Sequence, residues 1–200
     1  AFHGDSALAR VRLGSGVEIP VEPFFGTMGV CPAGARGQGV MPPGVLGGNI
    51  DTRQLTVGST LYLPVLEPGA LFSCGDAHAA QGDGEVCVTG IESPMGGVLR
   101  FTLIKGKRIP APQYRVPAGS LTRRVDGGGW FATTGVGGDL YRASQDAVRA
   151  LIDHLAAVRG LSREDAYVLC SLAADLKISE IVDAGEYIVS AVLPDAIFVA

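Results

Sequence analysis

The sequence predicts an α+β fold, with a β-rich sandwich-like or barrel-like body followed by an antiparallel helix pair and a terminal strand. Glycine and proline contribute 29 and 12 residues, and most of both lie before residue 140. There they separate short β-like runs, a pattern typical of sandwiches and barrels. After Gly138 the apolar spacing changes to that of a helix. We therefore assign residues 1–128 to the body and residues 129–200 to an α+β part.

The strands of the body are predicted from alternation of apolar and polar residues. Val98–Lys105 is the clearest case, because Leu99, Phe101 and Leu103 alternate with Arg100 and Thr102. Such alternation indicates a strand buried on one face. Three further runs read likewise: Thr60–Leu66, where Pro64 suggests an edge position or a bulge, Ala70–Cys74 and Glu85–Glu92.

Two helices and a strand are expected after the body. From Leu140 to Val158 the apolar residues fall on one helical face, and Gly160 is a typical C-terminal glycine. A second helix is expected over Ser162–Leu176, with its serine as cap and Asp165 completing an aspartate version of the capping box. The short connection favours an antiparallel pair. Tyr187–Leu193 reads as a final strand.

Composition excludes several classes of partner. The formal net charge is -4, and no basic stripe typical of nucleic-acid binders is present. No apolar run approaches the ~20 residues needed to span a bilayer. The four cysteines show no CxxC spacing, which argues against a thiolate zinc site and favours free thiols in a reducing compartment. We therefore expect a cytoplasmic protein that acts on neither nucleic acids nor membranes.

The densest polar segment runs from Gly75 to Glu85. It contains three carboxylates, one imidazole and three glycines. Asp76 and His78 are two residues apart, so in an extended chain they face the same side. Asp, His and Glu together match a zinc-type site with an open position for water, in which the metal lowers the pKa of that water toward ~7 and a spare carboxylate carries a proton. A glycine-rich turn with aspartates bonding the local backbone fits the pattern alone equally well.

A second segment, Pro43–Asp51, places Asn49 and Asp51 two residues apart after a glycine-rich turn. By itself this pattern is weak, because turns that contain asparagine and aspartate are common.

Together these segments resemble the acetamidase/formamidase family. The resemblance covers nearly the whole chain after about Val21, and its central motif is long and specific. It is carried by GGNIDTRQL (Gly47–Leu55), LYLPVLEPGALFSCGD (Leu61–Asp76), GDAHAAQGDGEVCVTGIE (Gly75–Glu92), LIKGKR (Leu103–Arg108), LSREDAYVLCSLAADLKISEIVD (Leu161–Asp183) and VLPDAIF (Val192–Phe198).

The resemblance implies hydrolysis of short primary amides, such as formamide and acetamide, to the acid and ammonia. It implies a divalent metal, zinc first among the candidates, bound by Asp76 and His78. Asp51 is expected as a further ligand, and Glu85 as a ligand or the general base, with Asp83 as its rival. We expect the substrate to contact Asn49, Gln81 and Gly82.

Members of this family are usually longer than this chain, with a β-rich N-terminal portion. They tend to assemble as dimers or larger. We therefore expect this chain to associate with itself or with a companion chain. Leu46 stands where the family often has histidine, so if that histidine acts in catalysis, the chemistry or the substrate of this chain is altered. Glu92 either reaches the site or forms a salt bridge at a strand end.

Two alternatives remain open on the sequence. The first is a non-catalytic subunit of a split amidase that binds a metal or a small ligand. The second is a cysteine amidase built on Cys74, which would need one of the three lysines, Lys105, Lys107 or Lys177, nearby.

Overall fold

The computed structural model describes residues 9–14, 16–34, 41–116, 129–182 and 185–199. They divide into two compact units. Unit 1 holds the described residues of Glu22–Ala79 and Glu92–Leu121, and unit 2 holds those of Ala7–Val21, Ala80–Ile91 and Thr122–Ala200. The boundary expected at residue 128 falls in 117–128, outside the described residues.

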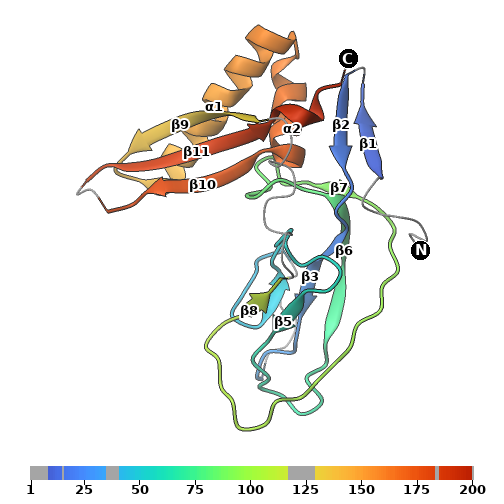
Figure 1. Cartoon of the computed structure of the whole chain (residues 1–200). Coiled ribbons are helices and arrows are strands. Elements are labelled where there is room, and N and C mark those ends of the chain that lie inside the picture. The colour runs from blue at the N-terminus through green and yellow to red at the C-terminus, as the bar shows by residue number, and fades with distance from the viewer. Residues whose placement is uncertain (1–8, 15, 35–40, 117–128, 183–184, 200) are drawn as a thin grey trace. The chain divides into compact units, whose positions relative to one another are not determined.

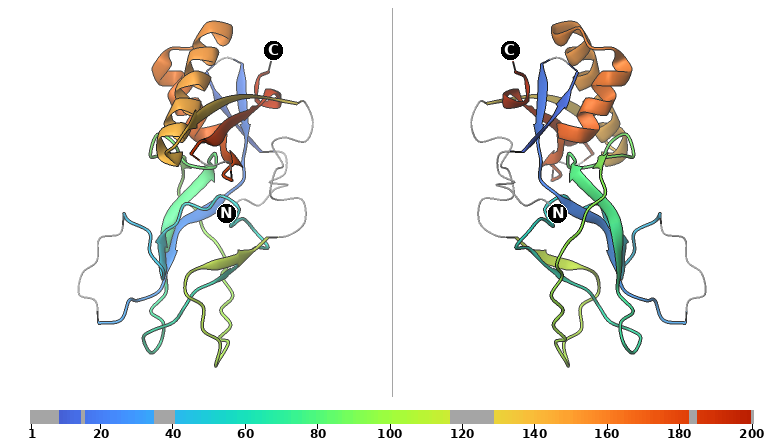
Figure 2. Two further views of the ribbon diagram at one scale, coloured as in Figure 1. Left: turned by 90° about the vertical axis from the view of Figure 1, so that its left-hand side faces the viewer. Right: turned by 90° about the vertical axis from the view of Figure 1, so that its right-hand side faces the viewer.

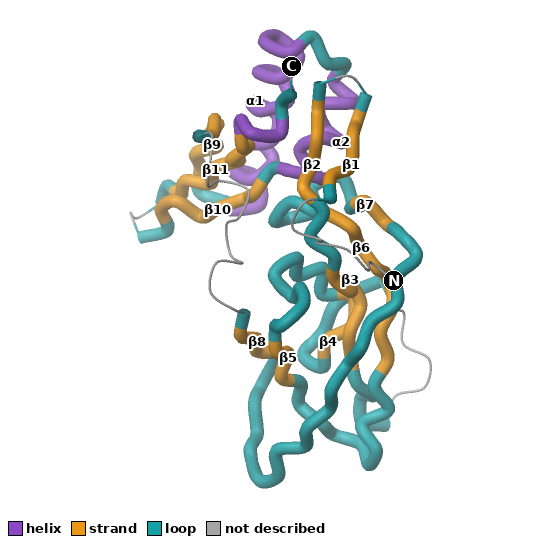
Figure 3. Tube along the Cα trace, turned by 45° about the vertical axis from the view of Figure 1, so that its right-hand side comes forward, coloured by secondary structure: helices purple, strands orange, loops and turns teal. Residues whose placement is uncertain are grey.

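Unit 1 is built from short strands and long connections (Figure 3). Its main sheet has the order β4-β3-β6-β7. The strands are β3 (Phe24–Gly29), β4 (Gly47–Asn49), β6 (Ser73–Ala80) and β7 (Ile91–Glu92), the last of which begins in unit 2. A separate antiparallel pair joins β5 (Thr60–Tyr62) to β8 (Gln113–Arg115). The longest strand, β6, carries the sequence SCGDAHAA and therefore includes the expected metal ligands.

Unit 2 contains an antiparallel sheet with the order β10-β11-β9. Helices α1 (Leu140–Arg159) and α2 (Arg163–Ala173) lie together on one side of this sheet (Figures 1 and 2). The sheet strands are β9 (Trp130–Gly137), β10 (Asp175–Glu180) and β11 (Tyr187–Pro194). A hairpin of β1 (Arg10–Leu13) and β2 (Val17–Pro20) and the 3-10 helix η2 (Asp195–Ile197) complete the unit.

The core of unit 2 lies between α1, α2 and the sheet. Leu151 and Leu155 of α1, Cys170 of α2 and Ala191 of β11 are almost fully buried in it. β9 presents alternate residues to α1: Phe131 stacks on the His154 ring with 3.7 Å between centroids. Helix-facing apolar side chains therefore hold the two layers together, as the change of period in the sequence predicted.

The α+β class is confirmed, and so are the helix pair and the terminal strand. Asp139 caps α1 by accepting from the Arg142 N–H, and Gly160 ends it at a φ of 68°. The Ser162 side chain accepts from the Asp165 N–H, as the capping pattern predicted. None of the described helices is long and apolar enough to cross a membrane.

The predicted end of the second helix at Leu176 was wrong. α2 ends at Ala173, Ala174 has extended backbone, and Leu176 belongs to β10, opposite Ala191 of β11. Leucine at this position suits either a helical stripe or a half-buried strand, so apolar spacing alone did not separate the two.

The strand predicted over Val98–Lys105 was also wrong. None of its residues is in a strand, and Val98 is fully exposed. Alternation shows which face a strand would bury, but a strand also needs a neighbour to satisfy its backbone groups, and no described strand pairs with this segment. The other predicted runs were only partly right. Within Thr60–Leu66 only Thr60–Tyr62 is strand (β5), and within Glu85–Glu92 only Ile91–Glu92 (β7). The run Ala70–Cys74 overlaps the start of β6, which begins at Ser73 and continues to Ala80.

Close approach of α1 to β9 depends on Gly135. A Cβ at this position would lie 2.0 Å from the Ala143 carbonyl oxygen and 2.8 Å from the Ala147 nitrogen, both backbone atoms. The neighbouring Thr133 hydroxyl donates to the Ala147 carbonyl at 2.7 Å. The helix therefore rests directly on the strand backbone at this point.

We predict that Gly135→Ala lowers the free energy of unfolding by about 3 kcal/mol, because the added methyl forces α1 away from β9. Gly137→Ala is the matched control on the same strand, since a Cβ there meets nothing within 4 Å. It should change stability by less than about 1 kcal/mol. Urea denaturation of both variants measures the difference, and equal stabilities would contradict the packing argument.

Candidate functional site

Strands β3 and β6 of unit 1 form the base of the site. Their antiparallel register pairs Phe24 with His78 and Thr27 with Gly75. Gly26 and Asp76 occupy the intervening positions of this ladder. The expected ligands therefore lie at the middle of a sheet with strands on both sides, where backbone pairing fixes them.

Asp76 and His78 meet directly. The His78 Nε2 lies 3.1 Å from the Asp76 Oδ1. The His78 side chain is almost completely buried, at 1% exposure, whereas that of Asp76 is 30% exposed. The Phe24 ring packs edge-on against the imidazole at 5.2 Å between centroids. The two-residue spacing thus brings carboxylate and imidazole together, with the ring held by the core and the carboxylate open to solvent.

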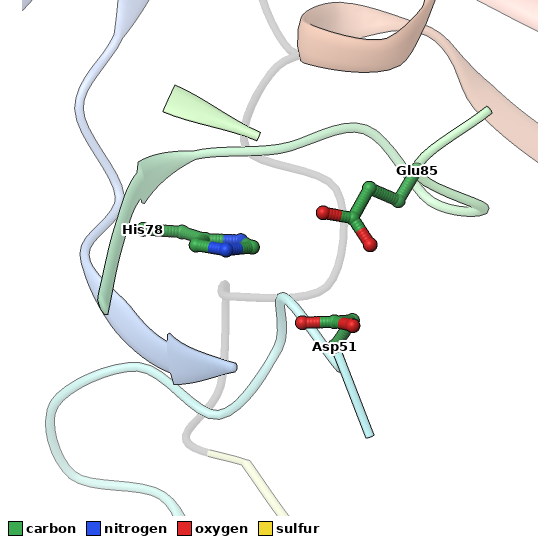
Figure 4. A group of neighbouring side chains, drawn as sticks. All are labelled: Asp51, His78 and Glu85. Atoms are coloured by element: carbon green, nitrogen blue, oxygen red, sulfur yellow. The ribbon is translucent and has the colours of Figure 1, made fainter. Parts of the chain in front are cut away.

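Asp51 joins the same place from the turn after β4. Its backbone N–H donates to the Gly26 carbonyl at 3.1 Å. A Cβ added to Gly26 would lie 2.4 Å from Asp51 Oδ1 and 2.8 Å from Asp76 Oδ2. Figure 4 shows His78 extending from β6 and Asp51 from its turn, and it also labels Glu85 on the segment after β6. Two carboxylates therefore converge over a position that only glycine can occupy.

Glu92 is also brought to this cluster. One donor atom from each of Asp76, His78 and Glu92 lies within 4.8 Å of the others. The adjacent Ser93 N–H donates to the Ala77 carbonyl at 2.9 Å, which fixes the chain next to β6. From the sequence, Glu92 either reached the site or formed a salt bridge at a strand end, and its local pattern did not distinguish these two roles.

Asn49 contacts the cluster through Thr27. The Thr27 hydroxyl donates to Asn49 Oδ1 at 2.8 Å and lies 3.4 Å from Asp76 Oδ2. Thr27 was not identified from the sequence, and only its register opposite Gly75 brings it here. Its hydroxyl links the amide expected at the substrate to a carboxylate expected at the metal.

The other expected site residues lie in unit 2, on the segment that follows β6. Gln81 and Gly82 are buried, while Asp83 and Glu85 are half-buried. The Asp83 N–H donates to Asp175 Oδ1 at 3.0 Å, and its carbonyl accepts from the Leu176 N–H at 3.0 Å. The Asp83 backbone is thus tied into the unit 2 core, as a turn-stabilising residue would be.

Glu85 borders a cavity of about 630 Å³ in unit 2. Val148, Ile152 and Leu176 provide apolar lining, and Tyr167 provides a polar group. Glu85 therefore lies at the edge of a cavity within its own unit.

Three carboxylate residues named from the sequence have strained backbones. Asp51, Asp76 and Glu85 have φ values of 40°, 55° and 41°, among six described non-glycine residues with positive φ. This region costs of order 1–3 kcal/mol and persists only where the surrounding structure enforces it. Such strain is concentrated at functional sites, so it marks these three side chains independently of their chemistry.

The donor set of unit 1 fits a divalent metal. Carboxylate oxygens and a neutral imidazole are suitable ligands for zinc. The convergence of Asp51 and Asp76 over Gly26 would be electrostatically unfavourable between two ionised groups, and a cation would offset that repulsion. Asp51, Asp76, His78 and Glu92 are the described residues of unit 1 that could hold it.

The cysteines differ in their surroundings. Cys74, on β6, is exposed, and all four cysteines are free. Cys170 is buried in α2, and burial, with a smaller contribution from Cys87, raises the pKa of its thiol from 9.0 to about 12. Cys170 is therefore a packing residue, and Cys74 is the accessible thiol that the cysteine-amidase alternative requires.

Fold and site together define an α+β protein with a carboxylate–imidazole cluster on a central strand. The chain belongs to the acetamidase/formamidase family, whose model matches residues 32–200. It is 44% identical over 75 residues to an acetamidase from Mycolicibacterium smegmatis, covering 36% of this chain and 18% of that protein. It is 45% identical over 58 residues to a formamidase from Methylophilus methylotrophus, covering 29% of this chain and 14% of that protein.

A solved structure shares the fold. The chain superposes on a gamma lactamase from Delftia acidovorans with a TM-score of 0.75 and 24% identity, covering 92% of this chain and 59% of that one. The chain thus spans about three-fifths of this structural relative, and its matches cover less than a fifth of each curated relative named above.

We predict that Gly26→Ala lowers the free energy of unfolding by about 2–3 kcal/mol, because its methyl displaces the Asp51 and Asp76 carboxylates. Gly75→Ala is the control on the paired strand, since a Cβ there meets nothing within 4 Å. Thermal and urea unfolding compare the two. A Gly26→Ala protein as stable as Gly75→Ala would mean that the carboxylates do not converge there.

We predict that iodoacetamide at pH 8 modifies Cys74 in the native protein and leaves Cys170 unmodified until urea is added. With a pKa of about 12, Cys170 is almost wholly a neutral thiol at that pH. The raised pKa favours the folded state below pH 9, and this contribution is lost as pH rises toward 12. Mass spectrometry of tryptic peptides gives the sites, and modification of native Cys170 at the Cys74 rate would contradict its burial.

Proposed function

We propose that this chain carries the catalytic centre of a metal-dependent amidohydrolase that cleaves short primary amides to carboxylate and ammonia. The observation behind the proposal is that the Asp51 and Asp76 carboxylates converge over Gly26, with His78 in contact with Asp76, in a member of this family. The substrate class is supported by relatives named acetamidase and formamidase.

Asp76, His78 and Asp51 would hold the metal, with zinc first among the candidates, and Glu92 is a fourth available donor. A divalent cation there would supply Lewis acidity, which lowers the pKa of a water and polarises an amide carbonyl. Asp76 fixes the orientation of the His78 ring through their contact at 3.1 Å. Burial by Phe24 keeps the imidazole in one position, as ligands of a metal require.

We propose Glu85 as the proton carrier. As water adds to the carbonyl carbon, Glu85 takes a proton from it and then delivers that proton to the departing nitrogen, so that ammonia leaves instead of an amide anion. Glu85 follows His78 by seven residues, and its own backbone is held at a φ of 41°. Asp83 is the rival, but its backbone groups already bond Asp175 and Leu176, which favours a role in the turn.

Substrate contacts are proposed for Asn49, Gln81 and Gly82. Asn49 is the best supported, because Thr27 orients its carbonyl oxygen and leaves the amide NH₂ group to donate to an acyl oxygen. Small amides offer one carbonyl and one amine, so few such contacts suffice to orient them.

A non-catalytic role is the second candidate. His78, buried against Phe24, and Asp76 are stable as a hydrogen-bonded pair, and a chain that binds a metal or small ligand without turnover would have the same pair. The two candidates differ only in whether a proton carrier acts at the centre.

We further propose that the protein acts as a homo-oligomer or with a companion chain in the cytoplasm. Exposed apolar side chains along residues 98–104, with Val98 fully exposed, support an association surface. Four free cysteines are consistent with a reducing compartment.

The direct test measures bound metal and ammonia release from formamide and acetamide, with and without a chelator. We expect stoichiometric divalent metal, turnover that the chelator abolishes, and recovery when zinc is returned. His78→Asn should lose both metal and turnover. Metal without turnover would favour the non-catalytic candidate, and chelator-resistant turnover that iodoacetamide abolishes would favour the cysteine amidase.

We predict that Glu85→Gln retains the metal and the fold but lowers kcat by roughly 10²–10⁴-fold, the range for a lost general base. Glu186→Gln, at an exposed position in unit 2, is the control and should behave as the parent. If Glu85→Gln loses the metal, Glu85 is a ligand and Asp83 becomes the candidate base. Normal turnover would exclude Glu85 from the reaction.

A further inference from the structure

The segment from Gly82 to Gly90 consists of turns, a bend and irregular backbone. Hydrogen bonds nevertheless attach it to α2 and to the start of β10. All of these residues belong to unit 2. The first of these hydrogen bonds runs from the Gly82 N–H to the Ser171 carbonyl, at 2.8 Å. A Cβ on Gly82 would lie 1.9 Å from the Ala174 carbonyl oxygen, so backbone rests on backbone here.

Ser171 bonds the C-terminal part of the segment, at Cys87 and Thr89. It is fully buried in α2, and its hydroxyl makes two bonds to a part of the chain more than 80 residues away. The hydroxyl oxygen accepts from the Cys87 N–H at 3.1 Å and donates its hydrogen to the Thr89 carbonyl at 2.8 Å. The Ser171 hydroxyl thus satisfies one backbone donor and one backbone acceptor of the segment. A buried backbone group left without a hydrogen-bond partner costs about 1–3 kcal/mol.

Asp175 bonds the N-terminal part of the segment, at Asp83. It is 1% exposed, at the first position of β10, and its Oδ1 accepts from the Asp83 N–H at 3.0 Å. The Tyr167 hydroxyl, also from α2, donates to the Val86 carbonyl. Three side chains from the α2–β10 corner therefore bond the backbone at four positions between 83 and 89.

Glu85 lies between these attachment points. Its φ of 41° and that of Val88, at 70°, are unfavourable for side chains with a Cβ. Its N–H donates to the Gly82 carbonyl at 3.2 Å, and its carbonyl accepts from the Val88 N–H at 2.8 Å. The side-chain bonds described above hold the backbone on both sides of Glu85, at Asp83 before it and at Val86, Cys87 and Thr89 after it, and so support this conformation.

We infer that Ser171 and Asp175 are positioning residues that hold Glu85 for its part in amide hydrolysis. The inference rests on the proposed function. Both residues act through the backbone of the Gly82–Gly90 segment and touch no reacting atom. Their loss should allow the segment to relax to an ordinary conformation, and a displacement of about 1 Å can cost roughly 10²-fold in rate.

The test compares Asp175→Ala, Asp175→Asn and Ser171→Ala in the metal-loaded protein. Asparagine keeps a carbonyl oxygen for the Asp83 N–H, and alanine does not. We expect kcat to fall roughly 10–100-fold in both alanine variants, with KM and metal content within about twofold of the parent. Asp175→Asn should recover most of this loss. Ser179→Ala, which removes an exposed hydroxyl bonded to Ser190, is the matched control.

Amide hydrogen exchange provides a readout that does not depend on turnover. Exchange should accelerate at Asp83 in Asp175→Ala and at Cys87 in Ser171→Ala, while amides of α1 stay protected. If exchange accelerates but kcat is unchanged in a parent that hydrolyses amides, the segment does not position the base and the inference fails. If the parent shows no turnover, the proposed function fails instead. Global loss of α1 protection would show a merely structural role and would also overturn the inference.

Discussion

Close packing at glycine positions, where only a hydrogen atom separates the backbone from its neighbour, is the constraint on which both units depend. At Gly26 the space of a methyl is taken by the oxygens of Asp51 and Asp76. At Gly82 it is taken by the Ala174 carbonyl, and at Gly135 by that of Ala143. The contacts at Gly26 and Gly82 join segments distant in sequence, and the contact at Gly135 joins β9 to the following helix α1. The high glycine content, which first suggested numerous turns, is thus partly explained by close packing at positions where a side chain has no room.

The site cluster follows from the first of these contacts. A strand pair normally keeps side chains of both strands over its surface, so that carboxylates from two segments would meet a residue between them. Glycine in β3 leaves that place open, and the Asp76 carboxylate from β6 and the Asp51 carboxylate from the turn after β4 occupy it together. The backbone strain at both aspartates is the local cost of this convergence.

Local patterns predicted the parts of this molecule that depend on local physics. The caps at Ser162 and Gly160 and the meeting of Asp76 with His78 required only spacing and backbone geometry. Pairing between distant segments was harder to predict. Val98–Lys105 alternates as a strand should, but it has no strand partner among the described residues. Gly26 and Thr27 gave no signal because their roles exist only once β3 lies beside β6.

The hydrogen bonds of Ser171 and Asp175 also bear on how this protein can be altered or recombined. The Gly82–Gly90 segment carries little regular structure, and such connections are usually the parts most easily exchanged between relatives. Here its conformation is encoded by side chains more than 80 residues downstream. A chimera that imported a different 82–90 sequence without its matching α2–β10 corner would bury backbone groups that nothing satisfies. The two stretches would have to be exchanged together, although their bonded residues lie more than 80 positions apart.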